Sequence, residues 1–378
     1  MAKRKSPQQK PLEAVELDLQ PNEASDLVPL ENEKVLKAHG WKTAFWTVLD
    51  EEAVEKCVVA VGLAADRRGD DRAEPDDSAT PESEEGGEPK WEIVRPRFAV
   101  PRNDRSTEDA EACTRHDGWV YVVGSHYGSK TGPLEKERQW VARFREDDFE
   151  GTLRDSRPKL EIAMNRFRLH RAVNDALRAF GPDLIELGPK VRKQLVKKTR
   201  KKAGKKAKAR ISPADLPINI EGASFTDERT LLIGLRFPVT AAGHPILAEL
   251  SGVEEMFGDK LAAPVVRRFW VLSNVGSAGT PCGVRALHRS GRELHAVVGN
   301  LDDPSKDSVL IADHPAGGKA RSAHYRFRLP RGRDGGEVEA ELVRRFKAEN
   351  VEGVARVGSR FHYVTDEDEK VRVRYPAG

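Results

Sequence analysis

Ionic side chains recur at one position of a repeated sequence block. Three segments align without a gap, and each opens with a glutamate, at Glu111, Glu221 and Glu352. A fourth segment, residues 283–300, has the same layout but carries Arg285 at this position. Carboxylates and a guanidinium that converge on one place can bind ions, hold a charged ligand or transfer protons. We therefore expect this position to carry the chemistry of the protein.

The far end of each block supplies a second set of polar residues. After an apolar strand, three of the blocks end at His126, Arg236 and Glu367, and Asp366 precedes the last of these. His126 is the only histidine in a repeated position, which makes it the candidate general base. A hydrogen-bonded structural histidine is the alternative. The candidate catalytic residues are His126, Glu221, Arg236 and Arg285.

Carboxylates outnumber cations in these positions. Two carboxylates about 5 Å apart repel by roughly 3 kcal/mol at an effective dielectric constant of 20, so protonation, an arginine or a cation must compensate them. Calcium, a hard cation that prefers oxygen ligands, is the expected cofactor if a metal binds. Structural ion pairs without a metal, and direct catalysis, are the alternatives. The candidate metal ligands are Glu111, Glu221, Glu352, Asp366 and Glu367.

The two arginines point to a different partner. Arg236 and Arg285 suit a small anionic ligand, because guanidinium pairs in a bidentate manner with carboxylate or phosphate. The motifs GxSxG and GxxxxGK[ST] do not occur, and no histidines are spaced as in HExxH. Their absence argues against common serine-hydrolase chemistry and against P-loop nucleotide hydrolysis.

Short strands must position these residues. Apolar runs rich in β-branched and aromatic residues alternate with Gly, Pro and Asp at intervals of roughly 8 to 20 residues, which predicts antiparallel strands rather than βαβ units. Two runs, at 44–49 and 57–61, precede Trp91. The strands predicted after Trp91 cover residues 119–123, 140–144, 230–235, 246–250, 269–272, 294–298, 309–312, 325–329, 361–364 and 371–375.

The repeat predicts the fold. Four occurrences of strand, turn, strand and further strand are typical of β-propeller blades, which have about 40 to 50 residues each. With an N-terminal blade from residues 28–100, the sequence predicts an all-β propeller of five or six blades over residues 26–378. Hydrophobic alternation without a true repeat is the alternative. We expect one blade to combine strands from both chain ends, which closes the ring without an exposed edge. The innermost strands would then bring Glu111, Glu221, Arg285 and Glu352 to one mouth of the channel.

Three segments depart from the strand pattern. Residues 1–25 are polar and predict a disordered tail, and residues 66–90 predict a disordered acidic loop. Residues 160–215 predict a helical insertion, because apolar side chains recur there at helical spacing. These side chains are Leu169, Val173, Leu177 and Phe180.

The insertion ends in a basic run. Lys190 to Arg210 contain twelve Lys or Arg and no acidic residue. Such a charge density can neutralise several phosphates, so nucleic acid is a candidate partner. The run has no aromatic residue on which bases could stack. A solvated surface arm, or pairing with the acidic 66–90 loop, is the alternative.

The cysteine content and the hydropathy of the sequence indicate the cellular compartment. The three cysteines, Cys57, Cys113 and Cys282, lie far apart and form no CxxC pair, so neither a disulfide framework nor a zinc site is indicated. Mean hydropathy is −0.61. No apolar run approaches the ~18 residues of a membrane span, and no apolar stretch follows the basic N-terminus. We expect a cytoplasmic protein without membrane contact.

Several short motifs occur in the repeated blocks. They are VVGSH at 122–126, INIEGA at 218–223, IGLRFP at 233–238, GVR at 283–285, and VEGVA and VTDEDE near the C-terminus. In these the sequence resembles an uncharacterised bacterial propeller family, known only as a domain of unknown function. That family is distantly similar to calcium-dependent, phytase-like esterase propellers. The resemblance covers residues 107–378 apart from the basic insertion, implies a propeller fold, and assigns no catalytic residue.

These observations lead to three functional hypotheses. The first is a binding or interaction platform for a protein or a small anionic ligand, with an ion-rich channel mouth. The second is a calcium-dependent hydrolase of a phosphoester, ester or lactone that uses the same mouth. The third is association with nucleic acid through Lys190 to Arg210.

Overall fold

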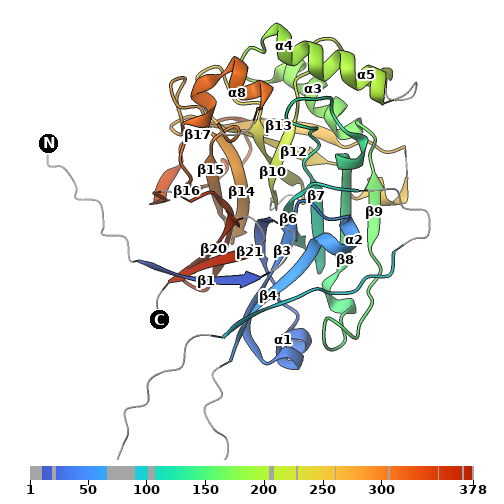
Figure 1. The fold of residues 1–378 in the computed structure, drawn as a ribbon, viewed down its shortest axis with the longest axis vertical. Helices are drawn as coiled ribbons and strands as arrows, with labels where there is room; N and C mark the ends of the chain where they lie inside the picture. Colours follow the sequence, from blue (N-terminus) through green and yellow to red (C-terminus); the bar gives the residue numbers. More distant parts are fainter. Residues whose placement is uncertain are drawn as a thin grey trace, which may run out of the picture.

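The strands form five sheets that surround a central axis (Figure 1). The computed structural model describes residues 11–18, 23–65, 90–100, 107–203, 208–226, 229–259, 261–304, 307–347, 349–367 and 370–376. In this part of the chain the fold is a five-bladed β-propeller. The prediction of an all-β propeller of five or six blades is confirmed.

Each blade is built on four antiparallel strands. Blade 1 consists of β2 (Ala24–Pro29), β3 (Trp41–Leu49), β4 (Val58–Ala64) and β5 (Trp91–Val94). Blade 2 consists of β6 (Ala110–His116), β7 (Trp119–Gly124), β8 (Trp140–Arg145) and β9 (Glu161–Met164). Blade 3 consists of β10 (Asn219–Phe225), β11 (Leu231–Phe237), β12 (Ile246–Ser251) and β13 (Val265–Leu272), with the short β17 (Gly336–Val338) parallel to β13. Blade 4 consists of β14 (Gly283–Ser290), β15 (Glu293–Gly299), β16 (Ala323–Phe327) and β18 (Glu341–Arg345).

Blade 5 joins the two ends of the chain. It consists of β19 (Val351–Val357), β20 (Arg360–Glu367), β21 (Lys370–Pro376) and β1 (Leu12–Asp18), which pairs antiparallel with β21. The expectation of a blade with strands from both ends is therefore confirmed. The prediction of a disordered tail over residues 1–25 is wrong for β1 and for the start of β2. Val15 and Leu17 pack against the core, and this tertiary contact outweighs the polar composition of the segment.

Four innermost strands carry a β-bulge at the repeated ionic position. The pairing of β6, β10, β14 and β19 with their neighbours shifts between residues 110 and 112, 220 and 222, 284 and 286, and 351 and 353. A bulged residue is left out of the ladder and the strand bends around it. The residues left out are Glu111, Glu221, Arg285 and Glu352.

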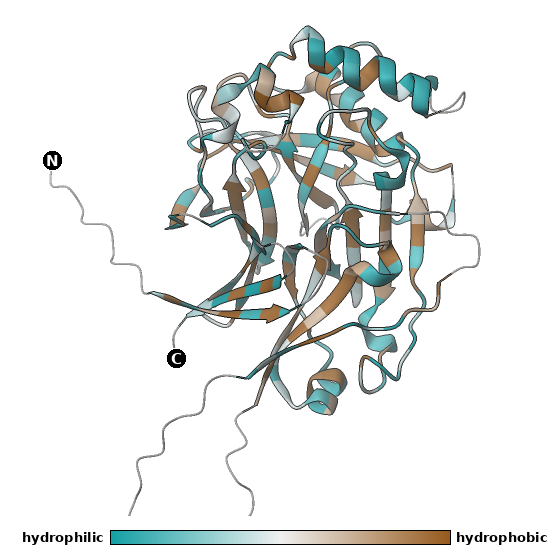
Figure 2. Ribbon diagram, viewed as in Figure 1, coloured by the Kyte–Doolittle hydropathy of each residue, from teal (hydrophilic) through white to brown (hydrophobic). Residues whose placement is uncertain are grey.

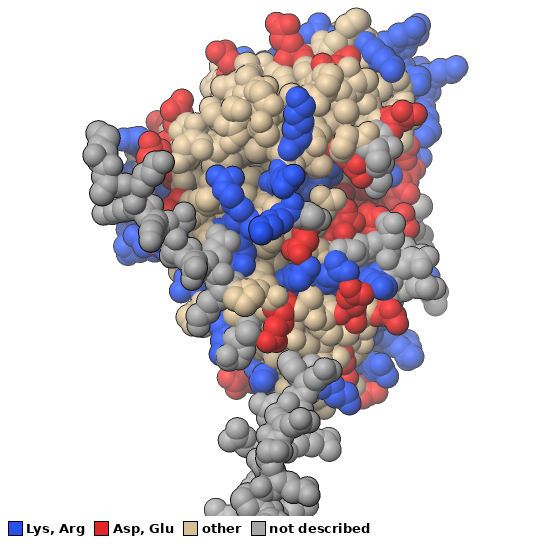
Figure 3. Space-filling view, turned by 60° about the vertical axis from the view of Figure 1, so that its left-hand side comes forward, with Lys and Arg blue, Asp and Glu red and all other residues tan. Residues whose placement is uncertain are grey.

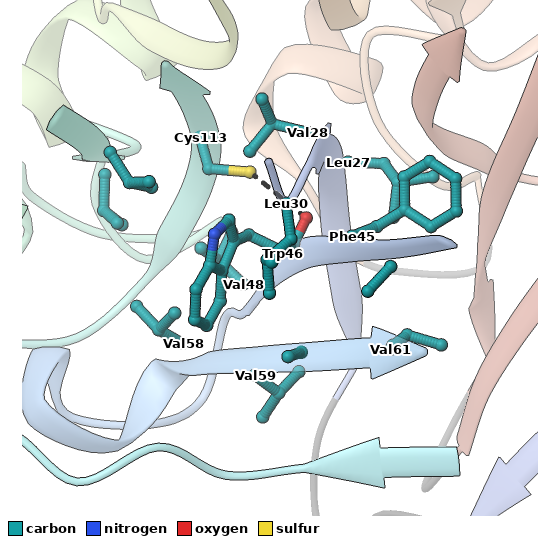
Figure 4. Packing of buried hydrophobic residues seen from close by; sticks show 14 of the residues in the cluster. Leu27, Val28, Leu30, Phe45, Trp46, Val48, Val58, Val59, Val61 and Cys113 are labelled. Atoms are coloured by element: carbon teal, nitrogen blue, oxygen red, sulfur yellow. Dashed lines mark hydrogen bonds between the residues drawn. The ribbon is translucent and has the colours of Figure 1, made fainter. Parts of the chain in front are cut away.

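Apolar contacts between blades hold the ring together. Phe45 and Trp46 of β3 are fully buried, and the Cys113 thiol of β6 contacts the Trp46 carbonyl oxygen at 3.8 Å (Figure 4). Blades 3 and 4 approach so closely that a Cβ at Gly222 would lie 2.9 Å from Leu287. The glycine of the INIEGA motif is therefore required by packing.

The helical insertion follows β9. It contains α3 (Arg168–Phe180), α4 (Pro189–Arg192), the π-helical η3 (Lys193–Lys198) and α5 (Thr199–Lys202). The predicted start of the insertion at residue 160 is too early, because residues 161–164 belong to blade 2. The consecutive segments α4, η3 and α5 bury the side chains Val191, Leu195 and Val196 on one face, whereas most of their remaining surface is hydrophilic (Figure 2). The described part of the basic run is thus a docked amphipathic helix.

One predicted strand is wrong. Residues 309–312 lie in helix α8 (Val309–Asp313), where the Ser308 hydroxyl accepts a hydrogen bond from the Leu310 N–H. A short apolar run fits a strand or a helix, and the serine N-cap decides between them. The remaining short elements are α1 (Glu33–His39), α2 (Val54–Cys57), η1 (Lys136–Arg138), η2 (Glu146–Asp148), α7 (Glu255–Gly258) and η4 (Pro315–Gly318).

Two further expectations concern the surface. The acidic loop predicted over residues 66–90 lies, apart from Lys90, outside the described residues. Within the part of the chain that is described, no helix has the length and apolar character to cross a membrane.

Candidate functional site

A cavity of about 620 Å³ lies at the mouth of the channel where the innermost strands begin. All five blades contribute to its wall, and the four bulged residues Glu111, Glu221, Arg285 and Glu352 are among its lining. The structure therefore brings the repeated ionic position of four distant blocks to a single place.

Ion pairs connect the bulged residues. The Arg285 Nε lies 2.9 Å from Glu221 Oε2, and the same guanidinium pairs with Glu352. The Ser25 hydroxyl of β2 lies within hydrogen-bonding distance of both Glu352, at 3.2 Å, and Glu111, at 3.3 Å. Arg285 thus lies between two carboxylates, and Ser25 of blade 1 links Glu352 to Glu111, so the four bulged residues belong to one chain of contacts.

The second predicted arginine also binds carboxylates. Arg236 Nη1 donates to Glu221 Oε1 at 2.6 Å, and its Nη2 lies 3.9 Å from Asp302 Oδ1. The nearby Glu221 and Asp302 carboxylates raise the pKa of the buried Arg236 guanidinium. An anionic ligand at Arg236 or Arg285 would have to compete with these carboxylates.

His126 lies away from this cavity. It is fully buried, its Nδ1 is 2.7 Å from the Gly124 carbonyl oxygen, and its Nε2 is 2.5 Å from the Asn165 side-chain amide. Burial lowers the pKa of His126 to about 4, so the ring is neutral near pH 7. Among the described residues that line the cavity, His126 is absent, and its contacts are those of a structural residue.

The predicted metal ligands are only partly assembled. Glu111, Glu221, Glu352 and Asp366 line the cavity, whereas the Glu367 side chain lies outside the described set. In the described ranges, no three His, Cys, Asp or Glu side chains are arranged to hold a metal ion. Arg285 supplies positive charge between Glu221 and Glu352, which is the compensation by arginine that the sequence left open beside protonation and a cation.

Several acidic residues of the cavity were not predicted, among them Asp50 and Asp109. Burial, followed by the neighbouring Asp109 and Glu51 carboxyl groups, raises the pKa of Asp50 to about 7. Asp50 Oδ1 is buried without a hydrogen-bond partner. Asp109 pairs with Arg138 at 2.8 Å, and burial also raises its pKa. Burial likewise raises the pKa of Glu111 well above its ordinary value, with Glu221 as the next cause.

The sequence contains a signal for part of this set. Two residues before the glutamates of three blocks stand Asp109, Asn219 and Asn350, and all three line the cavity. Asp109 and Asn350 directly precede β6 and β19, and Asn219 is the first residue of β10. Asp50 follows β3 directly and shares no such pattern, so only the structure reveals it.

The cavity has an excess of acid and several unsatisfied polar atoms. Its described lining holds eleven Asp or Glu against four Lys or Arg. Asn219 Oδ1 and Arg285 Nη1 have no hydrogen-bond partner, although these residues are only 7% and 5% exposed. Buried polar atoms in proteins are usually bonded, so such exceptions call for an explanation. A bound polar ligand would satisfy them.

Together these features define a five-bladed propeller with an acid-rich channel mouth. No protein-family model matches the chain, and no curated protein matches it significantly. The resemblance to an uncharacterised propeller family therefore stays a prediction.

Solved structures show only distant likeness. A mannose phosphorylase from Leishmania mexicana is 10% identical, with a TM-score of 0.39 over 96% of this chain and 87% of its own. An α-L-arabinofuranosidase from Clostridium thermocellum is 8% identical, with a TM-score of 0.35 over 90% and 81%. A putative 6-phosphogluconolactonase from Bacteroides uniformis is 11% identical, with a TM-score of 0.28 over 91% and 84%. At these values no conclusion about activity transfers.

Proposed function

We propose that this propeller is a binding protein whose acidic channel mouth takes a small ligand bearing amino groups. The observation that carries the proposal is the excess of carboxyl groups around a cavity of about 620 Å³, together with buried acceptor atoms that lack a donor. Small-molecule sites have volumes of about 300 to 1,000 Å³.

Two of the unsatisfied atoms are acceptors that favour a donor-rich cation over the anion expected from the sequence, whereas the third, Arg285 Nη1, is a donor and would need an acceptor. Asp50 Oδ1 and Asn219 Oδ1 are acceptors, and an ammonium group offers three donors and no acceptor. Arg236 and Arg285 already pair with Glu221, so the positive charges of the wall are largely compensated. The remaining carboxyl groups give the cavity a net negative charge.

The experiment is a calorimetric titration with spermidine at 20 mM and 200 mM NaCl. We expect binding that weakens with salt, because part of the attraction is between exposed charges. Asp50→Asn should weaken spermidine binding at pH 8 by about tenfold, the equivalent of roughly 1.4 kcal/mol. Glu150→Gln removes one exposed carboxylate outside the cavity and is the matched control. Equal binding by both variants, or no binding by the wild type, would refute the proposal.

A hydrolase at the same mouth is the second candidate. The observation that favours it is Asp50, whose pKa of about 7 suits a group that donates and accepts protons near neutrality. Hydrolysis of p-nitrophenyl phosphate, p-nitrophenyl acetate and a γ-lactone, each with and without calcium chloride, tests this reading. Calcium-dependent turnover that Glu352→Gln removes would support the calcium hypothesis, and absence of turnover of all three would count against a hydrolase.

Nucleic-acid binding through the insertion is the third candidate. Seven cations between residues 190 and 202 are exposed on one docked helix, which gives them a fixed spacing. Fluorescence anisotropy with a labelled duplex at 50 mM and 200 mM salt measures the effect. The double variant Lys193→Glu/Lys197→Glu should lose binding, whereas Lys34→Glu/Lys37→Glu on the exposed face of α1 should keep it. Equal loss in both would indicate net charge alone.

A further inference from the structure

The wall of the acidic cavity holds one unsatisfied acceptor and one unsatisfied donor where blades 3 and 4 meet. Asn219 Oδ1 and Arg285 Nη1 are both buried without a hydrogen-bond partner, and their residues are 7% and 5% exposed. Asn219 begins β10, Arg285 is the bulged residue of β14, and both residues line the cavity. A ligand that satisfies both atoms needs a donor for one and an acceptor for the other.

The protein fixes the orientation of both atoms. Asn219 Nδ2 donates to Glu221 Oε1 at 3.1 Å, and Arg285 Nε lies 2.9 Å from Glu221 Oε2. An ionised carboxylate only accepts hydrogen bonds, so the NH₂ end of the Asn219 amide must face Glu221 and its oxygen must face away. Glu352 binds a second nitrogen of the Arg285 guanidinium, which leaves Nη1 as the unsatisfied donor.

Hydroxyl groups suit this pair of atoms better than charged groups do. A hydroxyl donates through its O–H and accepts through its oxygen, so hydroxyl groups of a ligand can satisfy Asn219 Oδ1 and Arg285 Nη1 alike. An ammonium group has no acceptor for Arg285. A carboxylate has no donor for Asn219, and the nearby carboxylates Glu221 and Glu352 would repel it. Either charged group would leave one of the two wall atoms unsatisfied.

The remainder of the cavity requires positive charge. Asp50 Oδ1 is an unsatisfied acceptor, and the described lining holds eleven Asp or Glu against four Lys or Arg. This acid excess is local, because the whole chain has a formal net charge of +3 and Lys and Arg side chains gather in the middle of the surface shown in Figure 3. An ammonium group near Asp50 and hydroxyl groups near Arg285 are therefore complementary to different parts of one cavity.

We propose that the channel mouth binds a hydroxylated amine, the chemistry of an amino sugar or an aminocyclitol, with hydroxyl groups of the ligand against Asn219 and Arg285. This assignment rests on the proposed function and names the class of ligand for it. Asn219 and Arg285 are then specificity-determining residues. They distinguish a hydroxylated amine from a plain polyamine, because a site built to bind a hydroxyl group keeps unpaired polar atoms when the analogue lacks it.

Two matched ligands test the proposal by calorimetric titration of the full chain at pH 7 and 20 mM NaCl. 2-Deoxystreptamine and cis-1,3-diaminocyclohexane share a six-membered ring with two amino groups, and only the first carries hydroxyl groups. We expect 2-deoxystreptamine to bind about ten times more tightly. Equal binding of the two ligands, or tighter binding of the diamine without hydroxyl groups, overturns the assignment.

Three variants locate the origin of this preference. Asn219→Ala removes the acceptor, and Arg285→Lys keeps a positive charge between Glu221 and Glu352 but removes the donor, so each should reduce the preference to about twofold or less. Asn350→Ala is the matched control, because Asn350 has the same repeated position in blade 5 and, within the described chain, no buried side-chain atom that lacks a partner. Its ratio of the two affinities should stay near that of the wild type. Thermal unfolding checks that the variants fold, and an equal loss of preference in Asn350→Ala contradicts the assignment.

The outcomes separate this inference from the proposed function. If spermidine and the plain diamine bind but 2-deoxystreptamine binds no better, the amine site stands and its hydroxyl specificity falls. If none of the three amines binds, both fall. Tighter binding of 4-aminobutyrate than of 2-deoxystreptamine would show that Arg285 takes a carboxylate, and it would overturn the assignment.

Discussion

The backbone N–H of Asp109 donates to the backbone carbonyl oxygen of Asp50 at 2.7 Å. This bond connects the end of β3 in blade 1 with the start of β6 in blade 2 and holds the two carboxyl groups at the same wall of the cavity. Arg138 compensates Asp109, but Asp50 Oδ1 has no partner. Burial, with Asp109 as the next cause, therefore raises the pKa of Asp50 to about 7.

Spermidine binding should strengthen as the pH rises from 6 to 8. Asp50 loses its proton in this range, so the cavity gains a negative charge. We expect about a tenfold gain in affinity for the wild type and a much smaller gain for Asp50→Asn. Calorimetry at pH 6, 7 and 8 measures this. A profile that is identical in both proteins would show that Asp50 is not the titrating group.

Asp50→Asn should also stabilise the protein at high pH. The pKa of Asp50 is raised on folding, so its contribution to stability is present below its unfolded value near 3.8 and is lost as the pH rises through about 7. One pKa unit corresponds to about 1.4 kcal/mol, so a shift of about three units sets an upper bound of roughly 4 kcal/mol on the gain at pH 8, and we expect little change at pH 4. Urea unfolding at both pH values provides the comparison, with Glu150→Gln as the control.

Glu146→Ala should be strongly destabilising. The fully buried carboxylate accepts from Trp46 Nε1 at 2.6 Å and from Arg115 Nε at 3.1 Å, and it joins blades 1 and 2. Removing one member of a buried ion pair costs about 3 kcal/mol or more. We expect a smaller loss for Glu146→Gln, which keeps an acceptor. Denaturant unfolding measures the effect, and the exposed neighbour Asp148→Ala should change stability by less than about 0.5 kcal/mol.

Removal of residues 1–18 should open the ring at blade 5. This deletion removes β1, exposes the edge of β21, and takes away the packing of Val15 and Leu17. We expect a loss of about 2 kcal/mol or more and a stronger tendency to associate through the open edge. Calorimetric melting and light scattering report these effects. Removal of residues 1–10 leaves β1 complete, and an equal loss there would contradict the explanation.

The protein should lose stability as the pH falls below 6.5. His288, His295 and His324 lie together in blade 4, and His295 Nδ1 is 3.0 Å from His324 Nε2. Burial lowers the pKa of His288 to about 3 and of His295 to about 4, and that of His324 well below its usual value. Their stabilising contribution is present above the unfolded pKa near 6.5 and is lost as the pH falls toward 4.

The slope of the unfolding free energy against pH tests whether these histidines cause the loss of stability. Each one should contribute about 1.4 kcal/mol per pH unit between pH 6 and pH 4.5. His288→Gln should therefore reduce the slope of unfolding free energy against pH, while its stability at pH 7.5 reports the loss of the hydrogen bond from Arg356 N–H. An unchanged slope would assign the acid sensitivity to other groups.

Much of the site could be predicted from the repeat, because each repeated block contains the same backbone feature, a β-bulge in the innermost strand. A bulge recurs where the ladder must bend at the channel, and the bulged residue is ionic in four blades. Residues at the same position of the repeated blocks were therefore correctly expected to lie close together in the structure. Asp50 escaped prediction because its pKa arises from burial and from Asp109, which is distant in sequence.

Other differences between the expected and the observed positions have local causes. His126 occupies a repeated position, but its positive φ of 59° turns it toward Gly124 and Asn165 instead of the cavity. Residues 309–312 are as apolar as a strand, and a single N-cap at Ser308 makes them a helix. Polarity alone predicted disorder at β1, whereas pairing with β21 orders it.

The joining of β1 to β21 also has a consequence for synthesis. Glu16 of β1 contacts Lys370 of β21, a residue 354 positions later, so β1 leaves the ribosome long before its partner exists. Blades 1 to 4 have all their strands once residue 345 has emerged, whereas blade 5 must wait for β21. Closure of the ring is therefore the last step available to the nascent chain, and until then β1 is a strand without a neighbour.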